Sequence, residues 1–244
     1  MTSTKTGTLY LLPVGLSSPG DEAADWDHWL PAATRETACR LQHFVVENAK
    51  TARASLKALG HATPLRELDI RELPQHLDET TLDSLLELAM TGQDIGLMSE
   101  AGCPAVADPG ALLIRTAHHK GIPVKPLVGP SSLLLSLMAS GLDGQRFAFH
   151  GYLPARDPER SKAIQTLEKD SARLRQTQLF IETPYRNETL FQALLKSCQP
   201  STRLCVASDL TLASETIRTD SIAAWRKTEA PVLDKRPTVF LLLA

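Results

Sequence analysis

The sequence predicts an α/β protein of two domains, with a mostly parallel sheet in residues 1–127 and a mixed sheet in residues 128–244. Two observations predict this class. In the first half, apolar strand-like runs alternate with helix-like segments, which is typical of a parallel sheet covered by helices on both faces. After the turn-rich segment 140–144 fewer helices separate the strands, which favours a mixed sheet in the second half.

Length and composition are those of an ordinary globular protein. The 244 residues suffice for one large domain or two modest ones, and the hydrophobic fraction is 43%. The 26 basic and 28 acidic residues nearly balance, so net charge does not predict a nucleic-acid-binding protein, although it leaves room for a local basic face. The polar N-terminus and the lack of a long apolar run predict a cytoplasmic protein without membrane contact.

The use of cysteine points to a reducing environment. The four cysteines are too widely spaced to form a Cys-x-x-Cys pair, which argues against a zinc site or a disulfide framework, and we expect no metal. Cys198 and Cys205 lie in apolar segments and are expected in the core.

The first strand is predicted over residues 8–14, a continuous apolar run of the kind found in buried central strands. Turn-forming residues 15–21 follow it and are one candidate ligand loop. A helix-like segment begins at residues 26–30, and the next strand is predicted over residues 41–47, ending on an acid.

Amphipathic spacing and glycines that can end helices predict two further helices before the next buried strand. In order, these elements are a helix over residues 49–59 ending at Gly60, a short strand over 65–68, a helix over 80–91 ending at Gly92, and a strand over 95–98.

The stretch 95–110 is the most informative part of the first half. Its strand runs into a loop in which two glycines and two prolines are spaced through small residues. Such a loop is stiff and lets a ligand approach the backbone, and ligands of open α/β sheets bind at the carboxyl ends of strands. An ordinary strand-to-helix turn would explain the same residues. A helix over 111–119 and a strand over 122–128 follow, and the lack of a Gly-x-Gly-x-x-Gly motif after the first strand disfavours a dinucleotide site.

Residues 129–132, Gly-Pro-Ser-Ser, open the next helix. Helix capping alone would justify the two serines. A bound carboxylate at the free N–H groups is the alternative that we favour, because neighbouring strand ends can share one crevice. The elements predicted beyond this point are strands over 147–152, 179–183, 203–208 and 238–243, and helices over 161–177 and 187–198.

The order of these motifs resembles that of the tetrapyrrole methylase superfamily, which are S-adenosylmethionine-dependent enzymes of two α/β domains. The resemblance is closest to the branch of ribosomal small-subunit RNA 2′-O-ribose methyltransferases. Residues 7–13 are similar to the opening strand of that branch, residues 98–110 to its Ser-Asp-Ala-Gly-Thr-Pro loop, residues 126–132 to its Gly-Pro-Ser loop, and residues 180–186 to its Tyr-Glu-Ser-Pro-His-Arg motif. The resemblance covers most of the chain.

The resemblance implies a homodimer in which S-adenosylmethionine lies folded in a cleft between the two domains of a subunit. The zwitterionic tail of this cofactor needs N–H groups and hydroxyls, and its adenine needs an apolar slot, which small residues with exposed backbone can supply. The implied cofactor contacts are Pro13, Gly102, Cys103, Val106, Ser131, Ser132 and Glu182, with further contacts at Leu210 and Thr211.

The chain departs from the branch's pattern in the loops expected to meet the substrate. An acidic Glu-Asp-Thr-Arg motif is here Glu-Asn-Ala-Lys over residues 47–50, and a Thr-Lys motif with paired glutamates is replaced over residues 208–215 without the lysine. The loop acid and threonine are here Glu100 and Cys103, and the Pro-Ile-Gly-Asn turn is replaced over residues 14–17. These departures are compatible with a divergent paralogue that acts on a different substrate.

Methyl transfer from a sulfonium requires alignment of donor and acceptor, and a ribose hydroxyl also needs a general base. Glu100, Glu47 and Glu182 are the acids at predicted strand ends. We expect Glu100 to be the catalytic base, and His150 is a second candidate.

An RNA acceptor predicts contacts to phosphate. Lys50 and Arg186 are candidate substrate contacts, although the start of a solvated helix explains them equally well. An RNA substrate also predicts a basic face, whose candidate members are Arg156, Arg160, Lys162, Lys169, Arg173 and Arg175.

Three functions stay open on the sequence. The first is an RNA 2′-O-methyltransferase whose partner is ribosomal RNA or the small ribosomal subunit, which the resemblance favours. The second is a methyltransferase for a small tetrapyrrole-like molecule, which the near-neutral net charge favours. The third is a non-catalytic S-adenosylmethionine-binding paralogue, which the altered substrate motifs favour.

Overall fold

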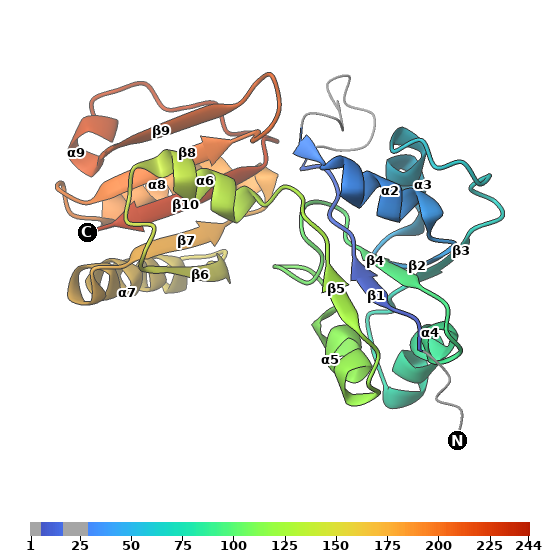
Figure 1. Cartoon of the computed structure of the whole chain (residues 1–244). Coiled ribbons are helices and arrows are strands. Elements are labelled where there is room, and N and C mark those ends of the chain that lie inside the picture. The colour runs from blue at the N-terminus through green and yellow to red at the C-terminus, as the bar shows by residue number, and fades with distance from the viewer. Residues whose placement is uncertain (1–5, 17–28) are drawn as a thin grey trace. The chain divides into compact units, whose positions relative to one another are not determined.

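A computed structural model of the chain describes residues 6–16 and 29–244, so the predicted loop 15–21 and helical start 26–30 lie largely outside the described residues. The chain divides into two compact units, Met1–Ser131 and Ser132–Ala244, whose elements are labelled in Figure 1. Each unit has a sheet and a core of its own. The placing of a domain boundary after residue 127 stays a prediction.

The first unit contains a five-stranded sheet with the strand order β3-β2-β4-β1-β5, and all its neighbouring strands are parallel. The strands are β1 (Leu9–Leu11), β2 (His43–Val46), β3 (Asp69–Glu72), β4 (Ile95–Met98) and β5 (Val124–Pro126). The helices are α2 (Ala32–Arg40), α3 (Ala49–Ala58), α4 (Glu79–Met90) and α5 (Ala111–His119).

Alternate side chains of this sheet enter two separate cores, so helices cover both of its faces as predicted. Phe44 and Val46 of β2 pack with residues of α2 and α3, whereas Val45 between them packs with residues of α4 and α5. Leu9 of β1 and Leu97 of β4 join the second core. Each such fully buried side chain contributes about 1.5–3 kcal/mol to stability. Figure 1 shows the two helix pairs on opposite sides of the sheet.

Local sequence explains where these helices begin. The Asn48 side chain accepts hydrogen bonds from the N–H groups of Lys50 and Thr51, and the Asp78 side chain accepts one from Thr81, so asparagine and aspartate cap α3 and α4. Such caps typically stabilise a helix by about 1 kcal/mol.

The second unit contains a mixed sheet with the strand order β6-β7-β10-β8-β9, in which only β6 and β7 pair in parallel. This confirms the predicted mixed sheet. The strands are β6 (Phe147–Tyr152), β7 (Thr177–Ile181), β8 (Arg203–Ser208), β9 (Thr216–Ser221) and β10 (Thr238–Leu243). The helices are α6 (Ser132–Ser140), α7 (Glu159–Leu174), the 3₁₀ turn η1 (Pro184–Arg186), α8 (Asn187–Ser197) and α9 (Ile222–Trp225).

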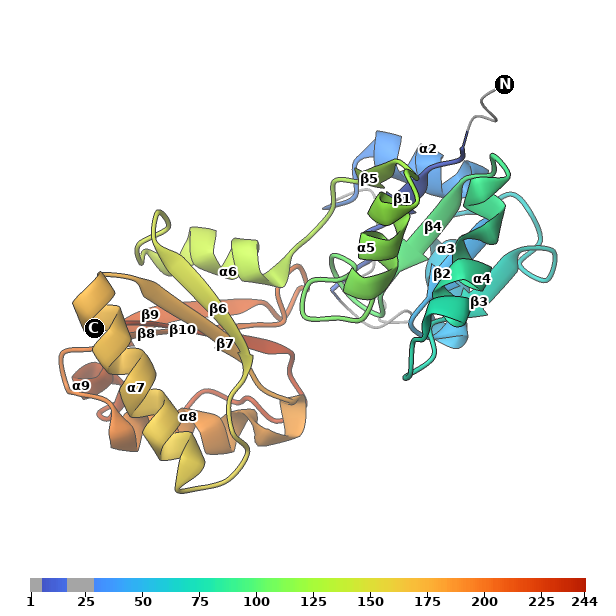
Figure 2. The ribbon, with the colours of Figure 1, turned by 90° about the horizontal axis from the view of Figure 1, so that it is seen from below.

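The two faces of the mixed sheet are covered unequally. Residues of α7, α8 and α9 pack with Phe180 and Phe240, whose rings stack 6.0 Å apart, in the larger core. The other face packs against Leu137 of α6 in a smaller core. Figure 2 shows α7 and α8 on one side of the sheet and α6 on the other.

Several predicted boundaries were wrong. The edge strand β3 lies at Asp69–Glu72 rather than at residues 65–68, the charged helix runs over Glu159–Leu174 rather than 161–177, and α9 and β9 were not predicted. Pattern reasoning failed at β3 and β9 because both are edge strands with many polar residues.

The four cysteines are free thiols, and Cys198 and Cys205 are buried as predicted. Across residues 6–16 and 29–244, no helix combines the length and apolarity needed to cross a bilayer. In the same residues no group of three or more histidine, cysteine or carboxylate side chains is arranged to hold a metal ion.

Candidate active site

The loop that follows β4 folds back onto the segment that follows β1. The N–H of Val14 donates to the carbonyl of Gly102 at 3.0 Å, and the N–H of Gly102 donates to the carbonyl of Gly15 at 3.3 Å. Because β1 and β4 are parallel neighbours, their carboxyl ends share one edge of the sheet. The two hydrogen bonds fix the loop 99–110 above this edge.

The loop that follows β5 joins the same place. A Cβ at Gly129 would lie 2.4 Å from the Cβ of Pro13, so only glycine permits the observed approach. The Cys103 thiol donates to the carbonyl of Pro130 at 3.4 Å. Burial raises the pKa of Cys103, which keeps the thiol protonated and able to donate. Pro13, Gly102 and Cys103 are therefore close together, with Ser131 next to Pro130 in the chain.

The backbone of the 99–110 loop adopts conformations that side chains disfavour. Ala105 and Ala107 both have a φ of 65°, in the left-handed region, and Gly110 has a φ of 128°. A non-glycine residue in that region costs roughly 1–3 kcal/mol, and such strain gathers at functional sites. Neither Ala105 nor Ala107 has a hydrogen-bond partner for its N–H among the described residues, and Val106 between them is 47% exposed. The loop thus presents free N–H groups and one apolar side chain.

Three carboxylates gather at the ends of β2 and β4. The N–H of Glu100 donates to Oε2 of Glu47 at 3.1 Å, and the Thr51 hydroxyl approaches Oε1 of Glu100 at 3.5 Å. Glu100, the predicted base, is exposed. Lys50 is exposed on the first turn of α3, beside Thr51, and neither ion pair nor hydrogen bond involves its ammonium group in the described part of the chain.

Asp108 is the third carboxylate, and the sequence reasoning missed it. Burial, together with the negative charges of Glu47 and Glu100, raises the pKa of Asp108 to about 6. The Ser99 hydroxyl lies near enough to favour the charged form, but it makes no hydrogen bond of good geometry within the described residues. An aspartate before Pro-Gly in a loop of small residues was the available signal.

In the second unit, β6, β7 and β8 end at one edge of the sheet, because β6 is parallel to β7 and both β7 and β8 are antiparallel to β10. Glu182 follows β7 and is 5% exposed. Its Oε1 accepts hydrogen bonds from the Arg186 guanidinium and from the N–H of Thr183, both at 2.7 Å. Burial alone would raise the pKa of Glu182, but these two donors hold it below its usual value.

The loop after β8 carries Leu210, which is buried, and Thr211, which is half-buried. Asp209 and Thr211 have left-handed φ values of 52° and 73°. The Arg236 guanidinium holds the Asp209 carboxylate at 2.7 Å, and the Glu215 carboxylate accepts from the N–H of Thr211 at 2.8 Å. The sequence reasoning named the loop but not the Arg236 ion pair that shapes it. Leu210, Thr211 and Glu182 lie at the same edge of the mixed sheet.

Ser131 and Ser132 stand where the two units meet in the sequence, and Ser132 begins α6. Both are half-buried, and neither hydroxyl has a hydrogen-bond partner among residues 6–16 and 29–244. The hydroxyls are therefore free for a ligand.

The predicted basic face is only partly present. Arg160 is 8% exposed and its guanidinium pairs with Asp157, so it belongs to the interior of the second unit. The other five candidates are exposed, and Lys162, Lys169 and Arg173 are on α7. His150, the second candidate base, donates or accepts a 2.6 Å hydrogen bond with Gln178 on β7.

Comparisons with known proteins agree with this architecture. No family model matches the chain. It is 28% identical over 237 residues to ribosomal RNA small subunit methyltransferase I of Xylella fastidiosa, covering 97% of this chain and 81% of the relative. It is 30% identical over 235 residues to the protein of that name from Escherichia coli O157:H7, covering 91% of this chain and 72% of the relative.

The chain belongs to this family.

A solved structure of the methyltransferase CobJ has a TM-score of 0.62 over 98% of this chain and 94% of its own, at 17% identity, which shows a shared fold. The resemblance to the tetrapyrrole methylase superfamily is thus confirmed. As a member of the methyltransferase I family, the chain is a methyltransferase that uses S-adenosylmethionine.

The residues present fit this cofactor. The free N–H groups of Ala105 and Ala107 and the free hydroxyl of Ser131 are donors suited to the carboxylate of its amino-acid tail. The exposed Val106 side chain and the tight approach at Gly102 suit a flat apolar group.

Proposed function

We propose that this chain transfers a methyl group from S-adenosylmethionine to a ribose 2′-hydroxyl of ribosomal RNA in the small subunit. The convergence of the loops after β1, β4 and β5 at Pro13, Gly102 and Cys103 carries the proposal. The relatives' name, ribosomal RNA small subunit methyltransferase I, supports the RNA acceptor.

In this proposal the cofactor supplies an activated methyl group on a sulfonium, and the chain aligns it with the acceptor. The hydrogen bonds between Val14 and Gly102 and between Cys103 and Pro130 keep the loops rigid. The loops therefore lose little conformational entropy when the cofactor binds. The proposed cofactor contacts are Pro13, Gly102, Cys103, Val106 and Ser131 in the first unit and Ser132, Glu182, Leu210 and Thr211 in the second.

Glu100 is proposed to take the proton of the acceptor hydroxyl. Its carboxylate is exposed, and the Glu47 contact to its N–H together with Thr51 orients it. Lys50 is proposed to contact a phosphate, because its ammonium group is exposed close to Thr51. Arg186 is the second proposed phosphate contact: one nitrogen bonds Glu182, but its side chain is 45% exposed and offers further N–H donors.

The sequence also left open a non-catalytic S-adenosylmethionine-binding paralogue, and membership of a methyltransferase family argues against it. Its support was the residues at 47–50 and 208–215, where an arginine and a lysine of the resembling branch are replaced or missing. A small tetrapyrrole-like acceptor has weaker support, since the likeness to CobJ at 17% identity concerns the fold alone.

We also propose a cytoplasmic homodimer. A cytoplasmic location follows from the proposed ribosomal RNA acceptor. The dimer is supported by Leu134 and Met138, which are 53% and 80% exposed one turn apart on α6 and would be covered by a second copy. Analytical ultracentrifugation tests it, with a dimer expected for the unaltered chain and a shift toward monomer for Met138→Lys.

Labelled methyl transfer from S-adenosylmethionine into a fractionated cell extract separates the three functions. We expect label in ribosomal RNA. Label in small molecules would favour the tetrapyrrole-like acceptor, and calorimetric binding of the cofactor without label in any fraction would favour the non-catalytic paralogue.

A further inference from the structure

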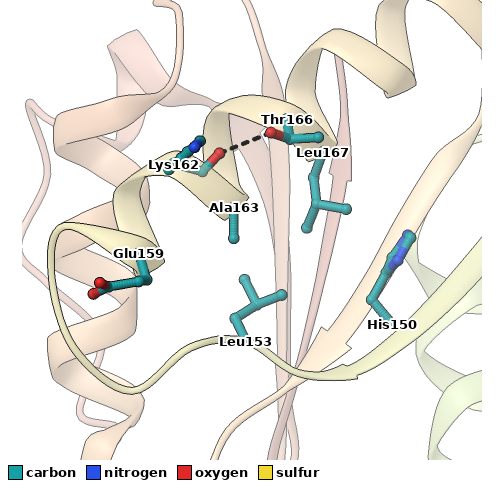
Figure 3. A pocket seen from close by; sticks show the side chains of 7 residues that line it. All are labelled: His150, Leu153, Glu159, Lys162, Ala163, Thr166 and Leu167. Atoms are coloured by element: carbon teal, nitrogen blue, oxygen red, sulfur yellow. Dashed lines mark hydrogen bonds between the residues drawn. The ribbon is translucent and has the colours of Figure 1, made fainter.

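The second unit has a groove between the edge strand β6 and the helix α7 that the proposed methyl-transfer residues do not use. The cavity measures about 410 Å³, which lies within the roughly 300–1,000 Å³ range of pockets that hold small organic groups. Figure 3 shows its floor, where the side chains of Leu153, Ala163 and Leu167 point toward a common space, while the carboxylate of Glu159 is turned away from it.

His150 forms the β6 side of the groove, and its ring is held in place. The amide nitrogen of the buried Gln178 donates to both oxygens of Gln176, at 2.9 and 3.2 Å, so its amide oxygen is the atom that faces His150 at 2.6 Å. Nε2 of His150 must therefore carry the proton and donate. An exposed imidazole fixed in this way is a suitable platform for a flat ring.

The solvent face of α7 beside this groove is basic. Lys162, Lys169 and Arg173 are spaced by seven and four residues, so Lys169 and Arg173 each lie about 20° from Lys162 around the helix, on opposite sides of it, and all three point away from the buried Ile164 and Leu167. Together they span about 16 Å along the helix axis.

These cations are available to a ligand. Within the described residues, no carboxylate forms an ion pair with Lys162 or Lys169. Arg173 pairs with Asp170 at 2.7 Å, but its side chain is 67% exposed. An exposed pair of this kind is weak and can exchange Asp170 for a phosphate.

We propose that this groove and the basic face of α7 bind single-stranded RNA, with an unpaired base over Leu153, Ala163 and Leu167 beside His150 and the neighbouring phosphates on Lys162, Lys169 and Arg173. Proteins that bind single strands with little sequence preference combine two features. One is a surface on which bases stack, and the other is a set of cations that contact the phosphates of the RNA backbone. The inference rests on the proposed RNA acceptor and adds a second contact region for it, outside the loops that hold the cofactor.

The test compares full-length variants for binding to a short single-stranded RNA of mixed sequence, the same RNA as a duplex, and inorganic polyphosphate. Replacing Lys162, Lys169 and Arg173 together by glutamine removes three phosphate contacts. Since each contact to a single strand contributes about 0.7 to the slope of log affinity against log salt, we expect the slope to fall by about 2 and the affinity at 0.1 M salt to fall about 100-fold. The matched control replaces Arg53, Lys57 and Arg66, which are exposed on the first unit, and is expected to change neither.

A second variant isolates the base platform. Ala163→Phe fills the groove and should weaken single-stranded RNA binding about 10-fold without affecting polyphosphate, whereas Gln165→Phe on the exposed side of α7 should leave both unchanged. Wild-type affinity and salt slope in the triple variant, or unchanged RNA binding in Ala163→Phe, would overturn the inference. Methyl transfer by the unaltered chain to ribosomal RNA is measured in parallel. If methyl transfer is present while the variants bind RNA normally, the inference fails and the proposed function stands. If methyl transfer is absent, the proposed function fails.

Discussion

Gly129 approaches Pro13 so closely that a Cβ on residue 129 would lie 2.4 Å from the Cβ of Pro13 and 2.8 Å from its Cγ. This contact joins the chain beyond β5 to the end of β1. It sets the position of Pro130, whose carbonyl accepts from the Cys103 thiol. One glycine thus holds together the loops proposed to bind the cofactor.

Gly129→Ala should disturb both stability and cofactor binding. The proline ring cannot move without moving β1, so we expect a loss of about 1–3 kcal/mol in the free energy of unfolding. Calorimetry should also show at least a tenfold weaker affinity for S-adenosylmethionine. The matched control is Gly144→Ala, because a Cβ there meets nothing within 4 Å, and its unfolding free energy should change by about 0.5 kcal/mol or less.

Asp108→Asn should stabilise the protein near neutral pH. The folded pKa of Asp108 is raised from 3.8 to about 6, so the folded state binds the proton more tightly than the unfolded state and loses stability as pH rises between these values. Removing the charge should therefore add about 1–3 kcal/mol at pH 7.5 and nothing at pH 3.5. Urea unfolding at both pH values measures this, and an equal effect at the two values would refute the proposed titration.

The pair Glu182–Arg186 has the opposite pH dependence. The folded pKa of Glu182 is depressed, so its contribution is complete above the usual glutamate value of 4.5 and is lost as pH falls through the lower folded value. Arg186→Gln leaves a buried carboxylate without its cation and should lower the free energy of unfolding at pH 7. The cost should shrink as the pH falls below the usual glutamate value, because burial without the Arg186 cation raises the pKa of Glu182 and favours its protonated form. A cost that stays constant down to pH 3 would show that Arg186 acts through packing instead.

The central strands of the first sheet could be predicted because they are buried on both faces. Residues 8–14 and 95–98 read as unbroken apolar runs, and the structure places β1 and β4 within them at the middle of the sheet. Edge strands give no such signal. Asp-Ile-Arg-Glu in β3 and Thr-Ile-Arg-Thr-Asp-Ser in β9 become strands through their partners β2 and β8, which the sequence does not reveal.

The parts of the candidate site that lie in short sequence motifs could be predicted. The loop 99–110 and the residues 129–132 stand out through their glycines, prolines and serines. The environment of Asp108 could not be predicted, because its pKa depends first on its burial in the fold and then on the charge of Glu47, which is distant in the sequence. Arg160 was predicted on a basic face because arginine side chains are usually exposed to solvent. Its pairing with Asp157 and its burial depend on the fold of the loop before α7.

The most direct test of the account is methyl transfer to purified small ribosomal subunits that lack this modification, followed by digestion of the RNA to nucleosides. With labelled S-adenosylmethionine and the unaltered chain, the account predicts label in a 2′-O-methylated nucleoside. It also predicts no label with Gly102→Val, because a larger side chain at a φ of 67° would meet Leu16 and displace the loop from the cofactor. Label on a base, no label at all, or full activity in a folded Gly102→Val variant would contradict the account.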